Sequence, residues 1–275
     1  MPRHFPAMVL AEIRKVFTRG SGIAALVIAL LVGLGAVGGY AWIHSGGDDG
    51  MSVNGTPISQ VFPASGLTVA GSALWARNFF VLPLFLLLAS ASTVGGELAD
   101  RTLREIVVRP VPRWSVLVSK LIALSTLAGA TLVVTLLPSL GLGIARFGLT
   151  LEAPPPDAAT IADLLGAYGA SFLSDIVLAA LAMAVSLIVP SVGGAVVAVA
   201  LLLMADKAVY YLLKALAFFG LKEAENLLPW TLNNAMDAWK GWEADWNPAQ
   251  FGALAIFLTV FLGFSIARFR RMDVP

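Results

Sequence analysis

Few side chains in this sequence could carry out catalytic or metal-binding chemistry. It contains no cysteine, which excludes disulfides, thiolate metal sites and cysteine nucleophiles. Its two histidines, His4 and His44, lie before and after the first long apolar run and are predicted to face opposite sides of a membrane. It has no phosphate-binding loop, HExxH zinc motif or hydrolase elbow. We therefore expect no enzymatic activity, no metal site and no nucleic-acid partner.

Charged residues gather between two long apolar runs, in the segment 95–113. Its apolar residues recur at helical spacing, and Pro110 and Pro112 then break the helix. A short amphipathic helix of this kind can dock in the groove of a partner, although the same charges also suit a plain loop beside a membrane. Glu97 and Arg101 lie four residues apart and are predicted to form an ion pair. The candidate docking residues are Glu97, Asp100, Arg101, Thr102, Arg104, Arg109, Pro110 and Arg113.

A second charged segment, residues 1–21, precedes the first apolar run. Its apolar residues at positions 9, 10, 13, 16 and 17 follow helical spacing and predict an amphipathic helix that lies in the membrane surface. A basic flank that only orients the first span is the simpler alternative. The charged residues of the predicted interfacial helix are Glu12, Arg14, Lys15 and Arg19.

Asp175, Asp206 and Lys207 lie inside apolar runs. An ionised side chain is costly there and usually faces the interior of a helix bundle or a water-filled path. Asp175 and Asp206 are therefore candidates for a transport path, or for a charge lock between their two spans. For Asp206 and Lys207 the alternative is a position near the outer interface, from which a long side chain reaches water. For Asp175, a functional role in a transport path or charge lock and a position near the interface both stay open.

Long apolar runs separate these charged residues. Of the 275 residues, 58% are hydrophobic and 13% are charged, which is far more apolar than an ordinary soluble domain. Runs of about 18 or more apolar residues predict membrane spans, so we expect an all-α integral membrane protein with one transmembrane domain over 1–275. Pro83 should kink the second span, Pro138 should bend or end the third, and Gly35 and Gly39 should let the first approach a neighbour closely. The six predicted spans cover residues 22–43, 73–94, 116–144, 167–189, 195–213 and 249–267.

The distribution of charge predicts the orientation, because Lys and Arg are enriched on the cytoplasmic side of membrane proteins. With both termini in the cytoplasm, twelve of the 18 Lys and Arg residues fall in inner segments. Most acidic residues then fall in the outer segments 44–72, 145–166 and 214–248. The segment 214–248 also carries four tryptophans, which favour the membrane–water boundary.

The order of residues from Glu97 to Lys120 resembles the permease subunits of type-2 ABC transporters. In that family the loop after the second span begins with Glu, passes a Gly-Thr pair and closes with Pro-Val-Ser-Arg before a span that starts with Lys. Arg101 stands here in place of the usual glycine, and Pro112 in place of the usual serine. The amphipathic start, the six spans and the long outer segments resemble the family's architecture over nearly the whole chain. The matching residues are Glu97, Thr102, Pro110, Val111, Arg113 and Lys120.

This resemblance implies the transmembrane subunit of an ATP-driven ABC export system in the inner (plasma) membrane of a prokaryote. Two permease chains, identical or different, would pair in the lipid, and a separate cytoplasmic ATPase dimer would dock on 95–113 and on the N-terminal helix. ATP and Mg²⁺ would bind to that ATPase, so this chain would hold no cofactor of its own. Two alternatives remain: a scaffold or force-transmitting subunit of a larger assembly, and a channel or carrier that works without an ATPase.

Overall fold

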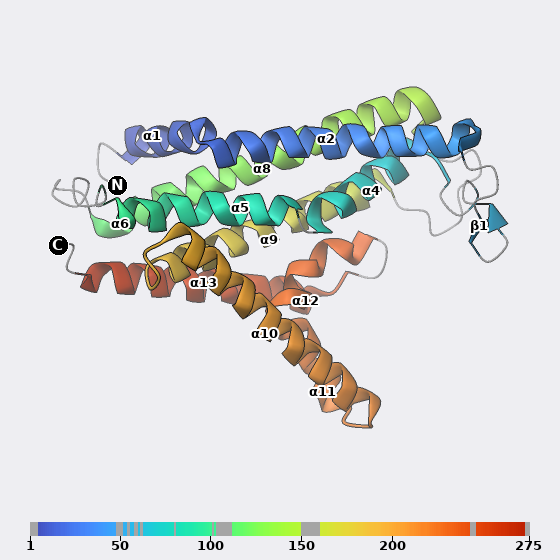
Figure 1. Ribbon diagram of the computed structural model, residues 1–275. Helices are drawn as coiled ribbons and strands as arrows, with labels where there is room; N and C mark the ends of the chain where they lie inside the picture. Colours follow the sequence, from blue (N-terminus) through green and yellow to red (C-terminus); the bar gives the residue numbers. More distant parts are fainter. Residues whose placement is uncertain are drawn as a thin grey trace.

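The computed structural model describes residues 5–47, 52–53, 56–57, 60, 63–79, 81–100, 102, 112–149, 160–242 and 246–272. Long helices lie side by side and form an elongated bundle (Figure 1). The strands among these residues are short: β1 (Ser52–Val53) pairs antiparallel with β2 (Thr56–Pro57) beyond the end of α2 (Gly20–Trp42). The described part of the chain is therefore almost entirely helical, as the sequence predicts.

The long helices account for the predicted spans. Among the described residues, five helices are long and apolar enough to cross a membrane, and a bent pair of helices gives a sixth candidate. The chain is thus a multi-pass membrane protein by the length and composition of its helices. The five are α2, α8 (Arg113–Phe147), α9 (Ile161–Ser186), α10 (Val192–Phe218) and α13 (Pro248–Arg271), and the bent pair is α4 (Gly66–Phe79) with α5 (Val81–Ala91).

The predicted kink in the second span is confirmed. The helical segments Gly66–Phe79 and Pro83–Ala99 are inclined by 46° to each other. Pro83 lies in the first turn of α5, where its missing N–H removes no helical hydrogen bond. The span nevertheless begins at Gly66, earlier than the predicted residue 73, so the outer segment before it is shorter than expected.

Pro138 is predicted to bend or end the third span. It does not end the span, because α8 continues past Pro138 to Phe147 and is 35 residues long. The outer segment predicted from residue 145 is therefore helical at its start. Hydroxyls next to the proline bind the backbone: Thr135 Oγ1 donates to the carbonyl of Ala29 in α2, and Ser139 Oγ donates to the carbonyl of Thr135. Neighbouring helices and hydroxyl groups of this kind let membrane helices tolerate proline.

Within the chain, α2 approaches α8 closely at Gly33 and not at the predicted Gly35 and Gly39. A Cβ atom at Gly33 would lie 2.7 Å from the carbonyl oxygen of Thr135 and 2.9 Å from Cγ of Pro138. At Gly35 and Gly39 it would meet no described atom within 4 Å. The prediction took the right kind of residue but the wrong face of the helix, because spacing alone does not tell which side meets a partner.

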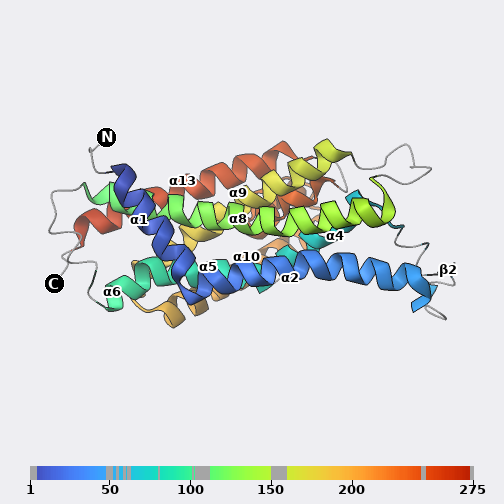
Figure 2. The same cartoon turned by 90° about the horizontal axis from the view of Figure 1, so that it is seen from above.

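The centre of the bundle is formed by α8 and α9. Helix α8 packs against α2, α4, α9 and α13, and also against α1 (Phe5–Thr18) (Figure 2). Small and medium apolar residues fill the space between α8 and α9, among them Leu124, Leu127 and Ala180. Tyr168 of α9 donates its hydroxyl to the carbonyl of Ala70, which joins α9 to α4.

Helix α10 extends away from the rest of the bundle in Figure 1. Its buried residues are Ala195 and Val199, both in its first two turns. It runs to Phe218, beyond the predicted end at residue 213. The chain returns to the bundle through short helices, so most of the predicted outer segment 214–248 is helical. These are α11 (Glu223–Leu227), η3 (Leu228–Trp230), α12 (Leu232–Met236) and η4 (Asp237–Trp242).

The predicted N-terminal helix is confirmed as α1. Leu10, predicted on the face toward the membrane, is 68% exposed, whereas Glu12 lies on the face that packs within the bundle and is 5% exposed. Phe5 and Val16 are buried as apolar contacts. Helix α1 therefore packs on α8 through a face that includes a carboxylate, and that carboxylate needs a partner inside the protein.

Candidate functional site

Five charged residues from three segments meet at one end of the bundle. The Lys120 ammonium of α8 lies 2.7 Å from Oε2 of Glu97 and 3.1 Å from Oε2 of Glu12. Lys15 Nζ lies 2.6 Å from Oε1 of Glu97, and Arg19 lies 3.4 Å from the same oxygen. Glu97 is the first residue of α6 (Glu97–Ala99). We call Glu12, Lys15, Arg19, Glu97 and Lys120 the α1–α6–α8 cluster.

The central members of this cluster are shielded from solvent. The side chain of Lys120 is fully buried, and those of Glu97 and Glu12 are 4% and 7% exposed. Lys15 and Arg19 lie on the solvent-facing side of the cluster, where 40% and 29% of their side chains are exposed. Each buried charge has at least one opposite charge within hydrogen-bonding distance, which is the condition under which buried charges are tolerated.

The residues of the cluster come from the N-terminal helical segment, from the start of α6 and from the first turns of α8. Glu12, Lys15 and Arg19 follow one another at spacings of three and four residues, so they lie on one face of the N-terminal helical segment. Lys120 lies two turns after the start of α8, and Glu97 follows the π-helical turn η2 (Ser92–Gly96). Figures 1 and 2 place α1, α6 and the start of α8 at the same end of the bundle.

The structure adds partners of Glu97 that the sequence did not predict. Its described partners are Lys15, Arg19 and Lys120, whereas the predicted partner Arg101 lies outside the described residues. Its carboxylate is therefore engaged within the chain and is not presented at the surface. Asp100 and Thr102 are exposed. Four further candidates from 95–113 lie outside the described residues: Arg101, Arg104, Arg109 and Pro110.

Arg113 joins the end of the segment 95–113 to the end of the last helix. Its Nη1 donates to the carbonyls of Phe269 (3.2 Å), Arg270 (3.1 Å) and Met272 (2.8 Å). The last carbonyls of a helix lack partners within that helix and attract cations. Arg113 therefore caps α13 in addition to opening α8.

The other residues assigned to the interfacial helix divide between the cluster and the surface. Arg14 is exposed. Lys15 and Arg19 bind Glu97, and Arg19 also donates to the hydroxyl of Ser92, 3.4 Å away. Glu12 binds Lys120. Three of the four predicted charged residues thus contact partners outside the N-terminal helix.

A second buried ion pair lies near the middle of the bundle. Arg77 Nη2 of α4 is 2.6 Å from Oδ2 of Asp175 in α9, and the two side chains are 0% and 6% exposed. Arg77 also donates to Thr131 of α8 and to Asn78 and Ser171. A charge lock at Asp175 was one of the two predicted possibilities, but it joins α9 to α4 and not to α10.

Asp206 has a structural role in the folded chain. Its carboxylate accepts hydrogen bonds from the backbone N–H groups of Leu232 (3.0 Å) and Asn233 (2.7 Å), at the start of α12. It thereby caps the N-terminus of a short helix, where an anion is favoured. The structure does not bring Asp206 to Asp175, so the predicted pair of transport-path residues lies apart.

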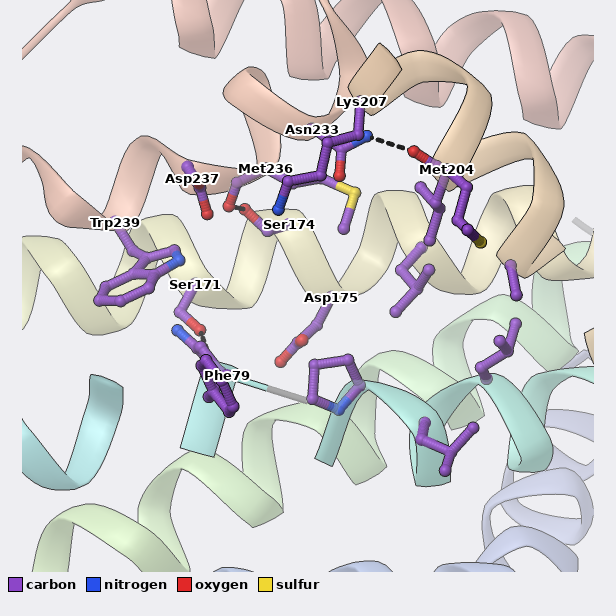
Figure 3. A pocket seen from close by; sticks show the side chains of 17 residues that line it. Phe79, Ser171, Ser174, Asp175, Met204, Lys207, Asn233, Met236, Asp237 and Trp239 are labelled. Atoms are coloured by element: carbon purple, nitrogen blue, oxygen red, sulfur yellow. Dashed lines mark hydrogen bonds between the residues drawn. The ribbon is translucent and has the colours of Figure 1, made fainter. Parts of the chain in front are cut away.

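A cavity of about 410 Å³ lies between α5, α9, α10 and the short helices α12 and η4 (Figure 3). Asp175 lines it, and so does Lys207, whereas Asp206 does not. Its wall is otherwise mainly apolar. The volume falls in the range of about 300–1,000 Å³ that small-molecule sites occupy. Among the described residues, no group of three or more His, Asp or Glu side chains could hold a metal ion.

Sequence reasoning missed two features of these sites. Arg77 was not recognised as an intramembrane charge, although an arginine between Gly66 and Ala99 interrupts a long apolar segment and was a usable signal. The burial of Lys120 and its two carboxylates carried no local signal, because the partners lie 23 and 108 residues away along the chain.

A comparison with protein families identifies one match. The family described as "Protein of unknown function (DUF2705)" matches residues 59–275. The chain belongs to this family. The matched range contains Glu97, Lys120, Arg77 and Asp175, whereas Glu12, Lys15 and Arg19 precede it. No curated protein matches the chain.

Proposed function

We propose that this chain is the transmembrane subunit of an ATP-driven ABC exporter in the plasma membrane of a prokaryote. Its termini and the segment 95–113 would face the cytoplasm, where a separate ATPase dimer docks and binds ATP and Mg²⁺. A second permease chain would complete the complex. The proposal is supported by the resemblance of Glu97, Thr102, Pro110, Arg113 and their neighbours to type-2 ABC permeases and by the distribution of Lys and Arg.

The α1–α6–α8 cluster is the observation that supports a coupling role most directly. The segment 95–113 connects α6, which begins at Glu97, to α8, which begins at Arg113. A force on this segment would act on Glu97, and Glu97 is bonded to Lys15 and Lys120. Breaking a buried pair typically costs about 3–5 kcal/mol. The displacement would therefore be carried to α1 and α8 rather than absorbed in a loose loop.

Helix α8 is suited to pass such a displacement on. It packs against α1, α2, α4, α9 and α13. Arg113 in its first turn holds the last carbonyls of α13. A shift of α8 along its axis would therefore move helices on both sides of the bundle, which is what alternating access requires of a transport subunit.

Co-purification with the partner ATPase tests the docking step. The chain would be expressed with a Walker-motif ATPase encoded beside it, and the triple variant R101A/R104A/R109A compared with R268A/R270A/R271A, which removes three arginines near the C-terminus. We expect ATPase recovery to fall by about tenfold only in the first variant, as expected when several charge-assisted contacts are lost. Equal recovery with both variants would contradict docking at 95–113.

The coupling role of Glu97 can be separated from docking. Because its carboxylate is buried, the E97Q variant should still recruit the ATPase. In vesicles, however, the complex should lose most of the ATP hydrolysis that depends on the permease. If E97Q abolished recruitment instead, Glu97 would be part of the docking surface. If it changed neither property, the cluster would have no part in coupling.

An ATPase-independent carrier is the second candidate function. The Arg77–Asp175 pair beside a cavity favours it, because ionisable residues at this depth often mark transport paths. A carrier of this kind would retain transport by vesicles that contain the purified chain without any ATPase. The loss of all transport until the ATPase is added would reject this candidate and support the first.

A further inference from the structure

The charged groups that line the cavity between α5, α9, α10, α12 and η4 differ in whether they have an ion-pair partner. Asp175 is paired with Arg77 at 2.6 Å, and Asp237 is paired with Lys240 at 2.7 Å. Lys207 forms no ion pair with any described residue. Among the described charged residues that line the cavity, Lys207 is therefore the one without a direct ion-pair partner.

The position of Lys207 makes this charge noteworthy. It lies within α10, a helix apolar enough to cross a membrane, fifteen residues after its first residue Val192. At about 1.5 Å per residue this is well inside the length that a bilayer core spans. Figure 3 shows its side chain reaching from α10 toward Ser174 and Met236, on the far wall of the cavity. A charge in such a position is expected to have a partner.

The hydroxyl and amide side chains of the cavity donate their hydrogens to acceptors within the chain, except the Asn78 amide nitrogen, which has no partner among the described residues. Ser174 Oγ donates to the carbonyl of Met236, and Ser171 Oγ donates to Oδ1 of Asn78. The Asn233 amide donates to the carbonyl of Leu203 and to Asp206. These bonds use the donor hydrogens of Ser171, Ser174 and Asn233, whereas the Lys207 ammonium donates to no described residue and is the charged donor available to a bound molecule.

The remaining wall is mainly apolar and is formed largely by α5, α9 and α10. Leu84 and Leu87 of α5, Leu178 of α9 and Met204 of α10 face the cavity, with the ring of Phe79 at its edge. Methionine adapts to ligands of different shape because its side chain is unbranched and polarizable. Apolar residues also cover the exposed surface of α10, among them Leu201 and Leu202, so an apolar molecule could reach the cavity from the lipid.

We propose that this cavity binds an anionic amphiphile, a molecule with an apolar hydrocarbon chain and one negatively charged oxygen head group. The head group pairs with the Lys207 ammonium, and the chain lies against the leucines and Met204. Two sources share this chemistry: an anionic lipid of the bilayer and a free amphiphilic carboxylate. The proposal does not depend on ATPase docking, since it uses only residues on the side of the bundle formed by α5, α9 and α10.

Trp239 supplies an optical test, because its ring lines the cavity. The purified full-length chain in a neutral detergent would be titrated with ω-bromoundecanoate, whose bromine quenches tryptophan fluorescence on contact. ω-Bromoundecanol, which has the same chain without the charge, is the control probe. We expect saturable quenching by the carboxylate, and its absence in the W239F variant would assign the signal to the cavity.

The role of the charge is tested by matched lysine variants. Lys214 lies two turns further along α10 and is exposed, as Lys207 is, but it does not line the cavity. K207Q should weaken binding of ω-bromoundecanoate on the order of tenfold, as for the loss of one charge-assisted contact. K214Q should bind as the natural chain does, and K207R should restore binding if K207Q lowers the yield of folded protein. Equal binding by K207Q and K214Q, or equal quenching by acid and alcohol, would overturn the proposal.

The source of the amphiphile is distinguished in vesicles. The chain would be reconstituted with a small fraction of phosphatidylglycerol brominated on its acyl chains, or with the same fraction of brominated phosphatidylcholine. Stronger quenching of Trp239 by phosphatidylglycerol, reduced in K207Q, identifies a bilayer lipid as the occupant. Equal quenching by the two lipids, together with saturable binding of ω-bromoundecanoate, identifies the free carboxylate. Failure of both arms rejects the site but leaves the proposed coupling at Glu97 untouched.

Discussion

At the scale of residues, charges buried in this protein occur as partners from different helices. Lys120 is fully buried between two carboxylates, and Arg77 is fully buried against Asp175. In both places an arginine or lysine that is isolated in the sequence meets an acid from a distant segment. The energetic consequence is asymmetric, because removing one partner leaves the other charge buried and unpaired.

Replacing Lys120 with methionine should therefore destabilise the protein strongly. K120M leaves Glu12 and Glu97 facing only the partly exposed Lys15 and Arg19, and we expect a loss of about 3–5 kcal/mol in the free energy of unfolding. The control is K240M, because Lys240 pairs with Asp237 at the surface and such pairs contribute about 0–1 kcal/mol. Chemical unfolding in detergent measures both, and equal losses would contradict the buried cluster.

The Arg77–Asp175 pair makes a prediction about replacing both partners. D175N alone should lower the free energy of unfolding by about 3–5 kcal/mol, since Arg77 then keeps only neutral acceptors. The double variant R77M/D175L should recover most of that loss, because apolar residues of similar volume can replace a buried pair. If the double variant keeps its stability but loses function, the charges serve function rather than folding. Equal instability of the single and double variants would argue against this account of the pair.

At the scale of elements, two features fix how the helices meet. Gly33 lets α2 approach α8 next to Pro138, and Arg113 ties the start of α8 to the end of α13. Both contacts are made by backbone atoms of one partner. A change of side-chain rotamer in that partner helix cannot relieve or replace a contact with its backbone. Single substitutions at Gly33 or Arg113 should therefore disturb these contacts.

Alanine at Gly33 and at Gly35 should act in opposite directions. G35A meets no described atom within 4 Å and should stabilise α2 by up to about 1 kcal/mol, the difference in helix propensity between the two residues. G33A would place a methyl group 2.7 Å from a backbone oxygen of α8, and such overpacking costs about 1–3 kcal/mol. Thermal melting of the two variants in the same detergent compares them. A similar effect at both sites would place the contact elsewhere.

Removing the Arg113 side chain should loosen the end of α13. R113A leaves the carbonyls of Phe269, Arg270 and Met272 without their donor, so hydrogen exchange should accelerate in the last turn of α13. The start of α10, which Arg113 does not contact, is the internal reference. Unchanged exchange near residue 270 would show that the cap contributes little.

At the scale of the whole molecule, the chain has two ends of different character. One end carries the α1–α6–α8 cluster, the start of α8 and the end of α13, and the other carries the start of α9 and the short strands (Figure 2). The described basic residues of the predicted cytoplasmic side, among them Lys15, Arg19, Arg113 and Lys120, belong to the first end. Helix α10 leaves the bundle with a mostly apolar surface, which suits contact with lipid or with a second chain.

The absence of cysteine allows a direct test of orientation in the whole chain. Single cysteines at Arg104 and Met272 should react with a membrane-impermeant maleimide only after cells are opened, whereas one at Ser45, after α2, should react in intact cells. Comparable expression of the three variants is the control. Labelling of the Arg104 position in intact cells would place 95–113 outside and reject a cytoplasmic ATPase as its partner.

The apolar runs of the sequence were enough to predict the helices and their order. Each predicted span corresponds to a helix or bent helix pair, and the N-terminal amphipathic segment is α1. This worked because helix formation and membrane partition depend on residues a few positions apart, which a periodic pattern records. The errors at Pro138 and at the limits of the outer segments arose where a neighbouring helix supports the backbone.

Only the tertiary structure decided which charges meet. Glu97 turned out to bind Lys120 and the N-terminal helix, Asp175 to bind Arg77, and Asp206 to cap α12 rather than to line a path with Asp175. The partners Arg77 and Asp175 are 98 residues apart, and Glu12 and Lys120 are 108 apart. Local spacing carries no information on such pairs, because they depend on the rotation and depth of each helix after the whole bundle has packed.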